Sequence, residues 1–312
     1  MTENSNYLML VSPFKESKFD KKSWKRFQDL GDVVVLSKDV NFYDELMKKY
    51  NDVEIPEYVV GLSGDGGNNK FGKFASEKNR VFCPNTCGTG NDIARSLGFT
   101  KSFYKNSDEY LSLLENGNFE TKKFDVVDFS YETLDGIIND KAFIGVPLGI
   151  LAEVGDVGTF SKKIFGNSAY VLNGIKRILT HKPFEVAIEA NGNEIYEGYI
   201  SGGYAINTGT SGGSKFGVPG ENPFDGKMSL VYFPTEKKAK KIKLLGLANN
   251  LANCDDHPEE ITVIRGVKNF KITSMNSSYI PLGADGEVLP DCYEVEGKLM
   301  PGASEMYVAP GF

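Results

Sequence analysis

The chain has 312 residues, of which 40% are hydrophobic and 25% are charged. This composition excludes a disordered or fibrous protein and is typical of a soluble globular one, and the length predicts two domains. The 35 basic and 42 acidic residues leave a net charge of −7. That balance argues against nucleic acid as the main partner, because phosphate contacts need a basic surface.

The cysteines and the opening segment predict a cytoplasmic protein. The four cysteines form no CxxC pair, so buried free thiols in a reducing compartment are favoured over a zinc site. These cysteines are Cys83, Cys87, Cys254 and Cys292. The opening sequence MTENSNYLMLVSPFKE has neither the basic region of a signal peptide nor an apolar run long enough for a membrane span.

Short apolar runs alternate with helix-like stretches over about the first 125 residues. We expect strands over 7–11, 33–36, 58–62 and 80–83, and helices over 21–30, 43–50 and 92–97. A polar stretch follows residue 62. Apolar runs of this length between helices are typical of parallel strands covered on both faces. The first part of the chain is therefore predicted to be a Rossmann-like α/β domain.

The pattern changes to alternation after about residue 128. Apolar and polar residues alternate over 184–190, and Asn191-Gly192 then predicts a hairpin turn. Further strands are expected over 228–233, 261–264, 270–273, 293–300 and 305–309, with helices over 168–180 and 237–251. We predict an antiparallel β-sandwich. The expected domains are 1–127 with the tail 301–312, and 128–300.

The strand expected at 58–62 leads directly into SGDGG at 63–67. Glycines after a strand allow close backbone approach, so consecutive N–H groups there can bind an anion such as phosphate. Asp65 would repel phosphate unless a divalent cation lies between them, so it predicts Mg²⁺ bound with a nucleotide. A glycine-rich turn without a ligand is the alternative. The dinucleotide pattern GxGxxG is broken by Asn69, and no GK[ST] sequence occurs.

A second glycine-rich sequence follows the strand expected at 80–83. Residues 84–98 read PNTCGTGNDIARSLG, with Gly88 and Gly90 in the loop. Asn91 or Asp92 is placed to cap the next helix. Ligands of open α/β sheets bind beyond the carboxyl ends of the strands. Two such loops at successive strand ends therefore predict one shared crevice.

GTGNDIARSLG resembles the GTGND-x-AR-x-LG motif of the diacylglycerol kinase catalytic-domain family, which includes bacterial lipid kinases, ceramide kinases and sphingosine kinases. SGDGG stands where that family has GGDGT. Further matching segments follow in order: GNSAYVLNGIKRIL at 166–179, AINTGTSGG at 205–213, FDGKMSLV at 224–231 and GADGEVLP at 283–290. The resemblance covers nearly the whole chain and implies an α/β domain followed by a β-sandwich.

Several positions depart from the family pattern. Ser63 and Gly67 replace the first glycine and the threonine of GGDGT, and Lys70 replaces a glutamate that usually follows. The segment SPFKESK at 12–18 lacks the family's glycine-serine loop, and Leu151 stands where an aspartate often does. The missing threonine and loop weaken the expected phosphate contacts, which Lys70 would compensate if it contacts phosphate.

The resemblance also implies roles for matching residues. Asp285 would be the general base, with Glu287 on the same face of an extended stretch, and Asp65 would organise metal or phosphate. Asp225 matches a position that binds a structural Mg²⁺ in some family members, and Asp65 would be a metal ligand as well. For Asp285 and Asp225 an ordinary Asp-Gly turn is the alternative. The residues expected to bind the nucleotide are Ser63, Gly64, Asp65, Gly66, Gly67, Asn69, Gly88, Thr89, Gly90, Asn91 and Asp92.

Two further acidic residues, Asp125 and Asp128, lie near the expected domain junction. They would either join the hydrogen bonds around the nucleotide or cap structural elements.

The function implied is an ATP- and Mg²⁺-dependent lipid kinase, with diacylglycerol, ceramide and sphingoid bases all open as acceptors. One alternative is a non-catalytic nucleotide or lipid sensor, supported by Gly67 and Lys70. The other is an NAD kinase-like enzyme, although that family lacks the full series of motifs.

We expect the acceptor lipid to lie at the membrane surface. The basic run KKAKKIK, Lys237–Lys243, would make transient peripheral contact with the inner membrane surface, or would simply be a solvated face. The oligomeric state stays open, a homodimer included.

Overall fold

The computed structural model describes residues 6–13, 16–36, 42–85, 87–88, 90–99, 107–117, 120–155, 180–212, 217–237, 261–276 and 278–312. The chain divides into two compact units. The first consists of Met1–Phe124 with Gly302–Phe312, and the second of Asp125–Pro301. The second unit is thus inserted into the first along the chain.

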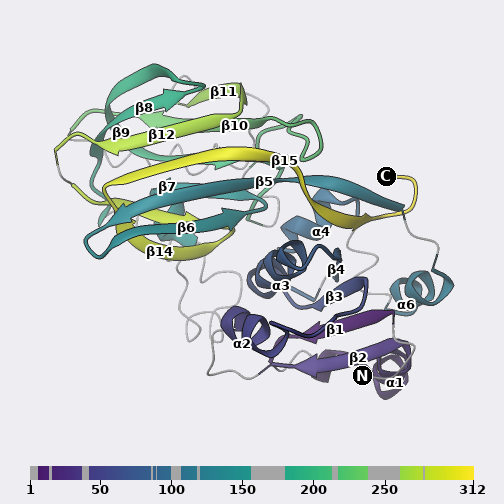
Figure 1. The fold of residues 1–312 in the computed structure, drawn as a ribbon. Helices are drawn as coiled ribbons and strands as arrows, with labels where there is room; N and C mark the ends of the chain where they lie inside the picture. The colour runs from purple at the N-terminus through teal and green to yellow at the C-terminus, as the bar shows by residue number, and fades with distance from the viewer. Residues whose placement is uncertain are drawn as a thin grey trace. The chain divides into compact units, whose positions relative to one another are not determined.

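The first unit contains a parallel sheet in the order β15-β4-β3-β1-β2 (Figure 1). Its strands are β1 (Tyr7–Val11), β2 (Gly31–Val35), β3 (Tyr58–Leu62), β4 (Val81–Pro84) and the end of β15 (Glu294–Val308). All residues of β1 are buried, as expected of a parallel strand covered on both faces.

Helices of this unit flank the sheet and pack in pairs, α1 against α6 and α2 against α3. They are α1 (Lys21–Leu30), α2 (Phe42–Lys49), α3 (Asp65–Glu77), α4 (Asp92–Ser96) and α6 (Ser107–Asn116), with the 3-10 helix η1 (Glu16–Lys18). Helix α1 begins after Asp20, whose carboxylate accepts a hydrogen bond from Ser23 N (2.7 Å) and so caps the first turn.

Helix α3 begins inside the glycine-rich sequence, where we expected a loop and a polar stretch. That prediction was wrong, since Gly66 and Gly67 lie in its first turn. Each interior glycine costs about 1 kcal/mol of helix stability relative to alanine. Phe71, Phe74 and Ala75 are completely buried on this helix, and their packing outweighs that cost.

The second unit consists mainly of antiparallel strands. Neighbours follow the order β14-β13-β7-β9-β8-β12-β15, β10 pairs with β9 and β11, and β5 pairs with β15 and β6. Its elements are β5 (Glu120–Thr133), β6 (Gly136–Ala142), β7 (Gly145–Gly149), α7 (Ile150–Gly155), β8 (Phe184–Ala190), β9 (Asn193–Ile206), β10 (Met228–Pro234), β11 (Thr262–Val267), β12 (Asn269–Ser274), β13 (Ile280–Ala284), β14 (Glu287–Cys292) and β15. The predicted class, an α/β domain followed by an antiparallel β domain, is confirmed.

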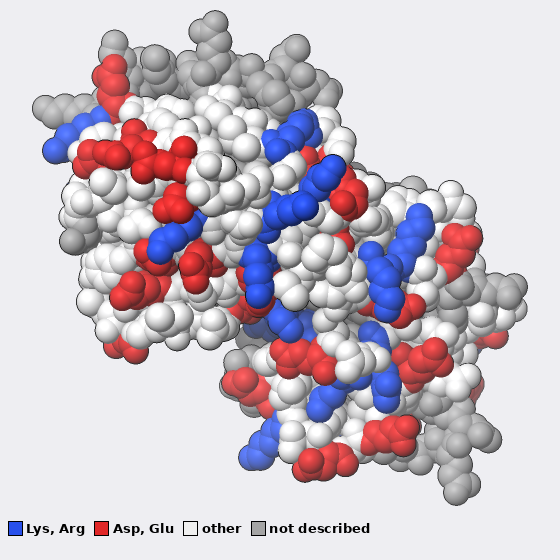
Figure 2. Space-filling model, turned by 45° about the horizontal axis from the view of Figure 1, so that its top comes forward, with Lys and Arg blue, Asp and Glu red and all other residues white. Residues whose placement is uncertain are grey.

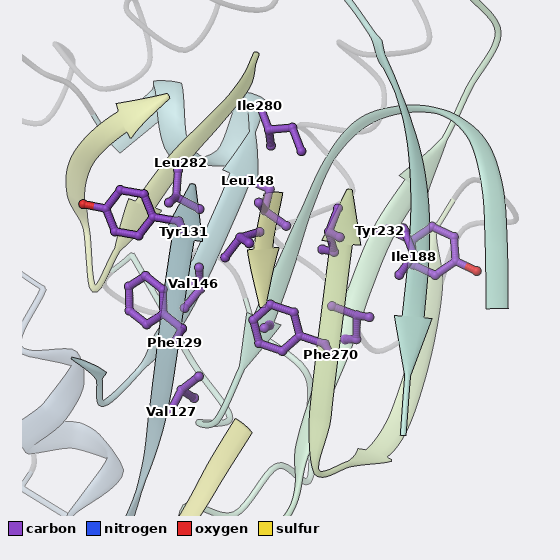
Figure 3. Packing of buried hydrophobic residues seen from close by; sticks show 14 of the residues in the cluster. Val127, Phe129, Tyr131, Val146, Leu148, Ile188, Tyr232, Phe270, Ile280 and Leu282 are labelled. Atoms are coloured by element: carbon purple, nitrogen blue, oxygen red, sulfur yellow. The ribbon is translucent and has the colours of Figure 1, made fainter. Parts of the chain in front are cut away.

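Apolar side chains from these strands form the core of the second unit. Phe129, Val146, Phe270 and Leu282, from four different strands, are buried in one cluster (Figure 3). In β8 the predicted alternation is present, with every second residue buried from Phe184 to Ala190. This alternation fixes which face of the strand meets the core.

Two other predicted features differ or lie outside the described residues. The strands expected at 293–300 and 305–309 are one continuous strand, β15. The helices expected at 168–180 and 237–251 lie outside the described residues apart from Thr180 and Lys237.

Candidate functional site

The two glycine-rich sequences lie against each other at the carboxyl ends of β3 and β4. A Cβ atom at Gly88 would lie only 2.6 Å from Gly64 Cα. Cys87 N donates a hydrogen bond to Ser63 O at 3.1 Å. Any larger residue at position 88 would push the backbones apart, so close approach of the two loops requires glycine.

Asp65 holds these loops together. Its Oδ2 accepts a hydrogen bond from Asn91 N (2.7 Å), and its Oδ1 accepts one from Asp92 N (2.6 Å). Both N–H groups belong to the start of α4, so Asp65, the first residue of α3, caps that helix from outside it. Burial raises the pKa of the Asp65 carboxyl above its usual range, and the N–H groups of Asn91 and Asp92 oppose that shift. A role in organising metal or phosphate stays a prediction.

Other side chains fix the second loop from within and from outside. Asn91 has a positive φ of 56°, its Oδ1 accepts from Gly88 N (2.8 Å), and its Nδ2 donates to Gly88 O (3.0 Å). Arg95 Nε donates to Gly90 O (2.7 Å), and Lys18 Nζ donates to Cys87 O (2.7 Å). The sequence analysis missed Arg95 and Lys18 as loop-fixing residues. Arg95 stands in the quoted GTGND-x-AR motif, whereas no local signal marks Lys18.

The other predicted nucleotide-binding residues of the first loop surround the start of α3. Ser63 follows β3 directly, Gly64 precedes the helix, and Gly66, Gly67 and Asn69 lie in its first turns. Lys70 also lies in α3, while Thr89 of the second loop is outside the described residues.

Asp285 and Gly286 of the second unit form the two-residue turn between β13 and β14. Both have positive φ, 50° and 84°, as a tight hairpin turn of this kind requires. The expectation that Asp285 and Glu287 share one face of an extended stretch is therefore wrong. The chain reverses at Asp285, and Glu287 is the first residue of the returning strand, paired with Ala284.

The Asp285 carboxylate is buried and serves the backbone of residues 143–145. Its Oδ2 accepts from Phe143 N (2.9 Å), and its Oδ1 accepts from Ile144 N (2.7 Å) and Gly145 N (2.9 Å). With 4% exposure, Asp285 is not part of a surface turn. The geometry ties the hairpin tip to the start of β7.

Asn207 links this hairpin to the FDGK segment. Its Nδ2 donates to Phe143 O (3.0 Å) and to Asp125 O (2.8 Å). The Asp125 carboxylate in turn accepts from Gly226 N (2.7 Å), which gives Asp125 a structural role. Three of the quoted motifs are thereby joined within the second unit. The sequence analysis did not single out Asn207, although a polar residue immediately after the buried end of β9 was a usable signal.

Comparisons with known proteins concern the whole chain and its fold. No family model matches the chain. A curated protein of Staphylococcus carnosus (strain TM300), named "Putative lipid kinase", is 26% identical over 254 residues, which are 80% of this chain and 76% of that protein. Among solved structures, a diacylglycerol kinase of Bacillus anthracis matches with a TM-score of 0.64 at 14% identity, covering 99% of both chains.

A second Bacillus anthracis structure, titled a "putative diacylglycerol kinase", matches with a TM-score of 0.68 at 16% identity, covering 97% of this chain and 95% of the other. The chain has the diacylglycerol kinase-like fold. The curated relative and these structures agree with the diacylglycerol kinase-like resemblance seen in the sequence.

The described acidic residues do not gather into a metal-binding cluster. Among the described residues, no group of three or more His, Cys, Asp or Glu side chains could hold a metal ion. Asp225 is exposed, and its Oδ1 accepts from Lys227 N (3.0 Å) within its own turn. Magnesium ions in kinases are held largely by substrate phosphates with one or two carboxylates, and these residues fit only that mode.

The charged surface of the diacylglycerol kinase-like chain is mixed. On the face that Figure 2 shows, basic and acidic side chains alternate in small groups. Asp128 is partly exposed, with Lys298 Nζ 4.0 Å from its carboxylate. In the described parts of the chain, no helix has both the length and the apolar character needed to cross a membrane.

Proposed function

We propose that the chain is a lipid kinase that transfers the γ-phosphate of ATP to a lipid hydroxyl in the presence of Mg²⁺. The observation that carries this proposal is Asp65 joining two glycine-rich loops at the carboxyl ends of neighbouring parallel strands. Ligands of α/β sheets bind at this edge, and the N–H groups of glycine-rich turns suit phosphate.

Phosphoryl transfer needs a held nucleotide, charge stabilisation and a carboxylate that orients and deprotonates the acceptor. We assign the nucleotide to the loops at 63–69 and 87–92, and the general base to Asp285. The assignment of Asp285 rests on the family resemblance of the DGE motif, and three backbone N–H groups hold its carboxylate in one orientation. Glu287 supplies a second carboxylate nearby in the chain. Bound Mg²⁺ would neutralise charge on the phosphates, and we propose that it arrives with ATP.

The names of the relatives support a lipid acceptor such as diacylglycerol. We include ceramide and sphingoid bases as further candidate acceptors. We also propose a cytoplasmic protein that meets its acceptor by transient contact with the inner membrane surface. The described cysteines support a reducing compartment, because Cys83, Cys87 and Cys292 are buried and form no disulfide with one another.

A non-catalytic nucleotide or lipid sensor is the second candidate. One observation favours it: the Asp285 carboxylate already accepts three backbone hydrogen bonds, which occupies lone pairs that a general base needs. Gly67 and Lys70 point the same way. Nucleotide binding without phosphate transfer would distinguish the sensor from the kinase.

The test is transfer of labelled γ-phosphate from Mg²⁺-ATP to diacylglycerol, monoacylglycerol, ceramide or sphingosine in mixed micelles. We expect one labelled lipid, and a loss of about a hundredfold or more in Asp285→Asn, the usual size of a general-base contribution. Glu287→Gln tests the second carboxylate. Asp135→Asn, an exposed aspartate of the β5–β6 turn, should keep full activity.

Because Asp285→Asn also disturbs the contacts with residues 143–145, its thermal unfolding and ATP affinity are measured beside its activity. ATP binding by the wild type without any labelled lipid would replace the kinase with the sensor. Failure of the wild type to bind ATP would overturn both.

A further inference from the structure

Two serines meet where β1 and β3 end. Ser12 follows β1, Ser63 follows β3, and their Oγ atoms lie 2.5 Å apart although 51 residues separate them in the chain. Ser63 is 2% exposed and Ser12 is 7% exposed. The parallel pairing of β1 with β3, which sets Val11 opposite Leu62, places the two side chains side by side.

The two serines have two hydroxyl protons, and the hydrogen bond between them needs only one. Each serine carries one donor and two acceptor positions, and the shared bond consumes one of the two protons. No other side-chain hydrogen bond of Ser12 or Ser63 occurs in the described part of the chain. Buried donors are nearly always bonded, so the second proton calls for an acceptor, and the described residues supply none.

Gly67 shows where that proton is directed. A Cβ atom at residue 67 would lie 1.9 Å from Ser63 Oγ and 2.4 Å from Ser12 Oγ. Both hydroxyls therefore face the first turn of α3, and they leave no room for a side chain there. The family motif GGDGT has glycine at position 63 and threonine at position 67. This chain has serine at 63 and glycine at 67, so the hydroxyl-bearing residue and the glycine have exchanged positions.

The surroundings favour a negatively charged acceptor. No side chain caps the start of α3, so the N–H groups of its first turn are available to an anion. Lys18 Nζ donates to Cys87 O in the second glycine-rich loop, which lies against Gly64, and brings a positive charge to that loop. The carboxylate of Asp65 accepts from Asn91 N and Asp92 N at the start of α4 and also interacts with its own N–H, so the N–H groups of Gly66 and Gly67 are the ones left for an anion in this turn.

We infer that Ser12 and Ser63 together donate a hydrogen bond to a phosphate oxygen of the bound nucleotide, in place of the threonine that the family has at position 67. This inference rests on the proposed nucleotide-binding function. It also means that a hydroxyl group remains beside the first turn of α3 although the threonine at position 67 is absent.

The test is binding of Mg²⁺-ATP, ADP and adenosine to the full-length protein by calorimetry. The variants are Ser12→Ala with Ser63→Ala, Ser63→Gly alone, Gly67→Thr alone, and the exchange Ser63→Gly with Gly67→Thr. Ser76→Ala is the matched control, because that hydroxyl lies near the other end of α3 and donates to Ala303 O. Circular dichroism and thermal unfolding show which variants are folded.

We expect the double alanine variant to bind ATP and ADP about tenfold to a hundredfold more weakly, the range for one hydrogen bond to a charged group. Adenosine affinity should be unchanged. Gly67→Thr alone should be destabilised by the clash, and the exchange should restore both folding and ATP affinity to within about threefold of the wild type.

The inference would be overturned if the double alanine variant bound ATP with an affinity within about twofold of the wild type. It would also be overturned if the variant lost as much affinity for adenosine as for ATP. An exchange variant that folds but does not regain ATP affinity would also overturn it. In each of these cases ATP binding and lipid phosphorylation by the wild type would leave the proposed kinase intact. Absence of ATP binding by the wild type would instead overturn the proposed function, and this inference with it.

Discussion

Asp65 is a partly buried carboxylate whose two oxygens both accept hydrogen bonds from backbone N–H groups at the start of α4. Burial is the largest influence on this group and raises the pKa of Asp65 above its ordinary value of 3.8. Protonation therefore favours the folded state. The stability that Asp65 contributes is fully present below pH 3.8 and is lost as the pH rises through the folded-state pKa.

This gives a prediction for Asp65→Asn, which cannot titrate. At pH 7 the variant should be less stable by about 1–3 kcal/mol, because its amide nitrogen faces one of the two N–H donors. As the pH falls from 7 toward 4, the wild type should gain stability relative to the variant. Urea unfolding across this range measures the difference.

Asp52→Asn, at an exposed aspartate of the first unit, serves as the control for the removal of one carboxylate from the chain. A gap between wild type and Asp65→Asn that stays constant or shrinks on acidification would contradict the assigned pKa direction.

At the scale of single elements, the β8–β9 hairpin shows a local signal that works. Asn191 and Gly192 have positive φ values of 53° and 78°. Asn191 also reaches the next strand, since its N donates to Asn269 O (2.9 Å) and its Oδ1 accepts from Lys268 N (2.8 Å). One residue thus closes the hairpin and joins it to the start of β12.

Replacing Asn191 by alanine should cost about 2–3 kcal/mol of unfolding free energy. About 1–2 kcal/mol comes from alanine in the left-handed conformation, and about 1 kcal/mol from the lost side-chain hydrogen bond. Asn191→Gly removes only the second contribution and should cost less. Urea denaturation at constant pH measures both.

The neighbouring Asn193→Ala should change stability by about 0.5 kcal/mol or less, since Asn193 has an exposed side chain and a negative φ. Equal losses for Asn191→Ala and Asn191→Gly would show that backbone strain plays no part.

At the scale of the molecule, the second unit is an insertion between Phe124 and Gly302. The first unit has its own buried residues, among them Met9, Val60 and Phe74. Its two segments meet where β5 pairs with β15. There Thr121 Oγ1 donates to Glu305 Oε1 (2.7 Å), and Lys123 Nζ lies 2.9 Å from Glu305 Oε2.

A chain that joins Phe124 to Gly302 through a short Asn-Gly link should therefore fold by itself. We expect a cooperative thermal transition by circular dichroism. If our assignment of the nucleotide loops holds, ATP should raise the midpoint temperature of this transition. At an ATP concentration a hundred times the Kd, bound ATP should add about 2.7 kcal/mol to the free energy of unfolding. It should transfer no phosphate, because Asp285 is removed. An unfolded product would show that the first unit depends on the second.

The sequence by itself determined the features that local pattern controls. Alternation fixed the buried face of β8, Asn191-Gly192 fixed a hairpin, and the ordered motifs indicated the family and the fold class. These signals work because strand periodicity, turn chemistry and short motifs each depend on residues close together in the chain.

Tertiary structure decided what depends on contacts between distant residues. Helix α3 forms through its glycines because Phe71 and Phe74 are buried, and Asp285 lies in a buried turn because residues 143–145 need its carboxylate. The meeting of Ser12 with Ser63, which makes Gly67 necessary, follows from the pairing of β1 with β3. No local pattern records such a meeting, because the free energy of a buried contact belongs to both partners and to the fold that brings them together.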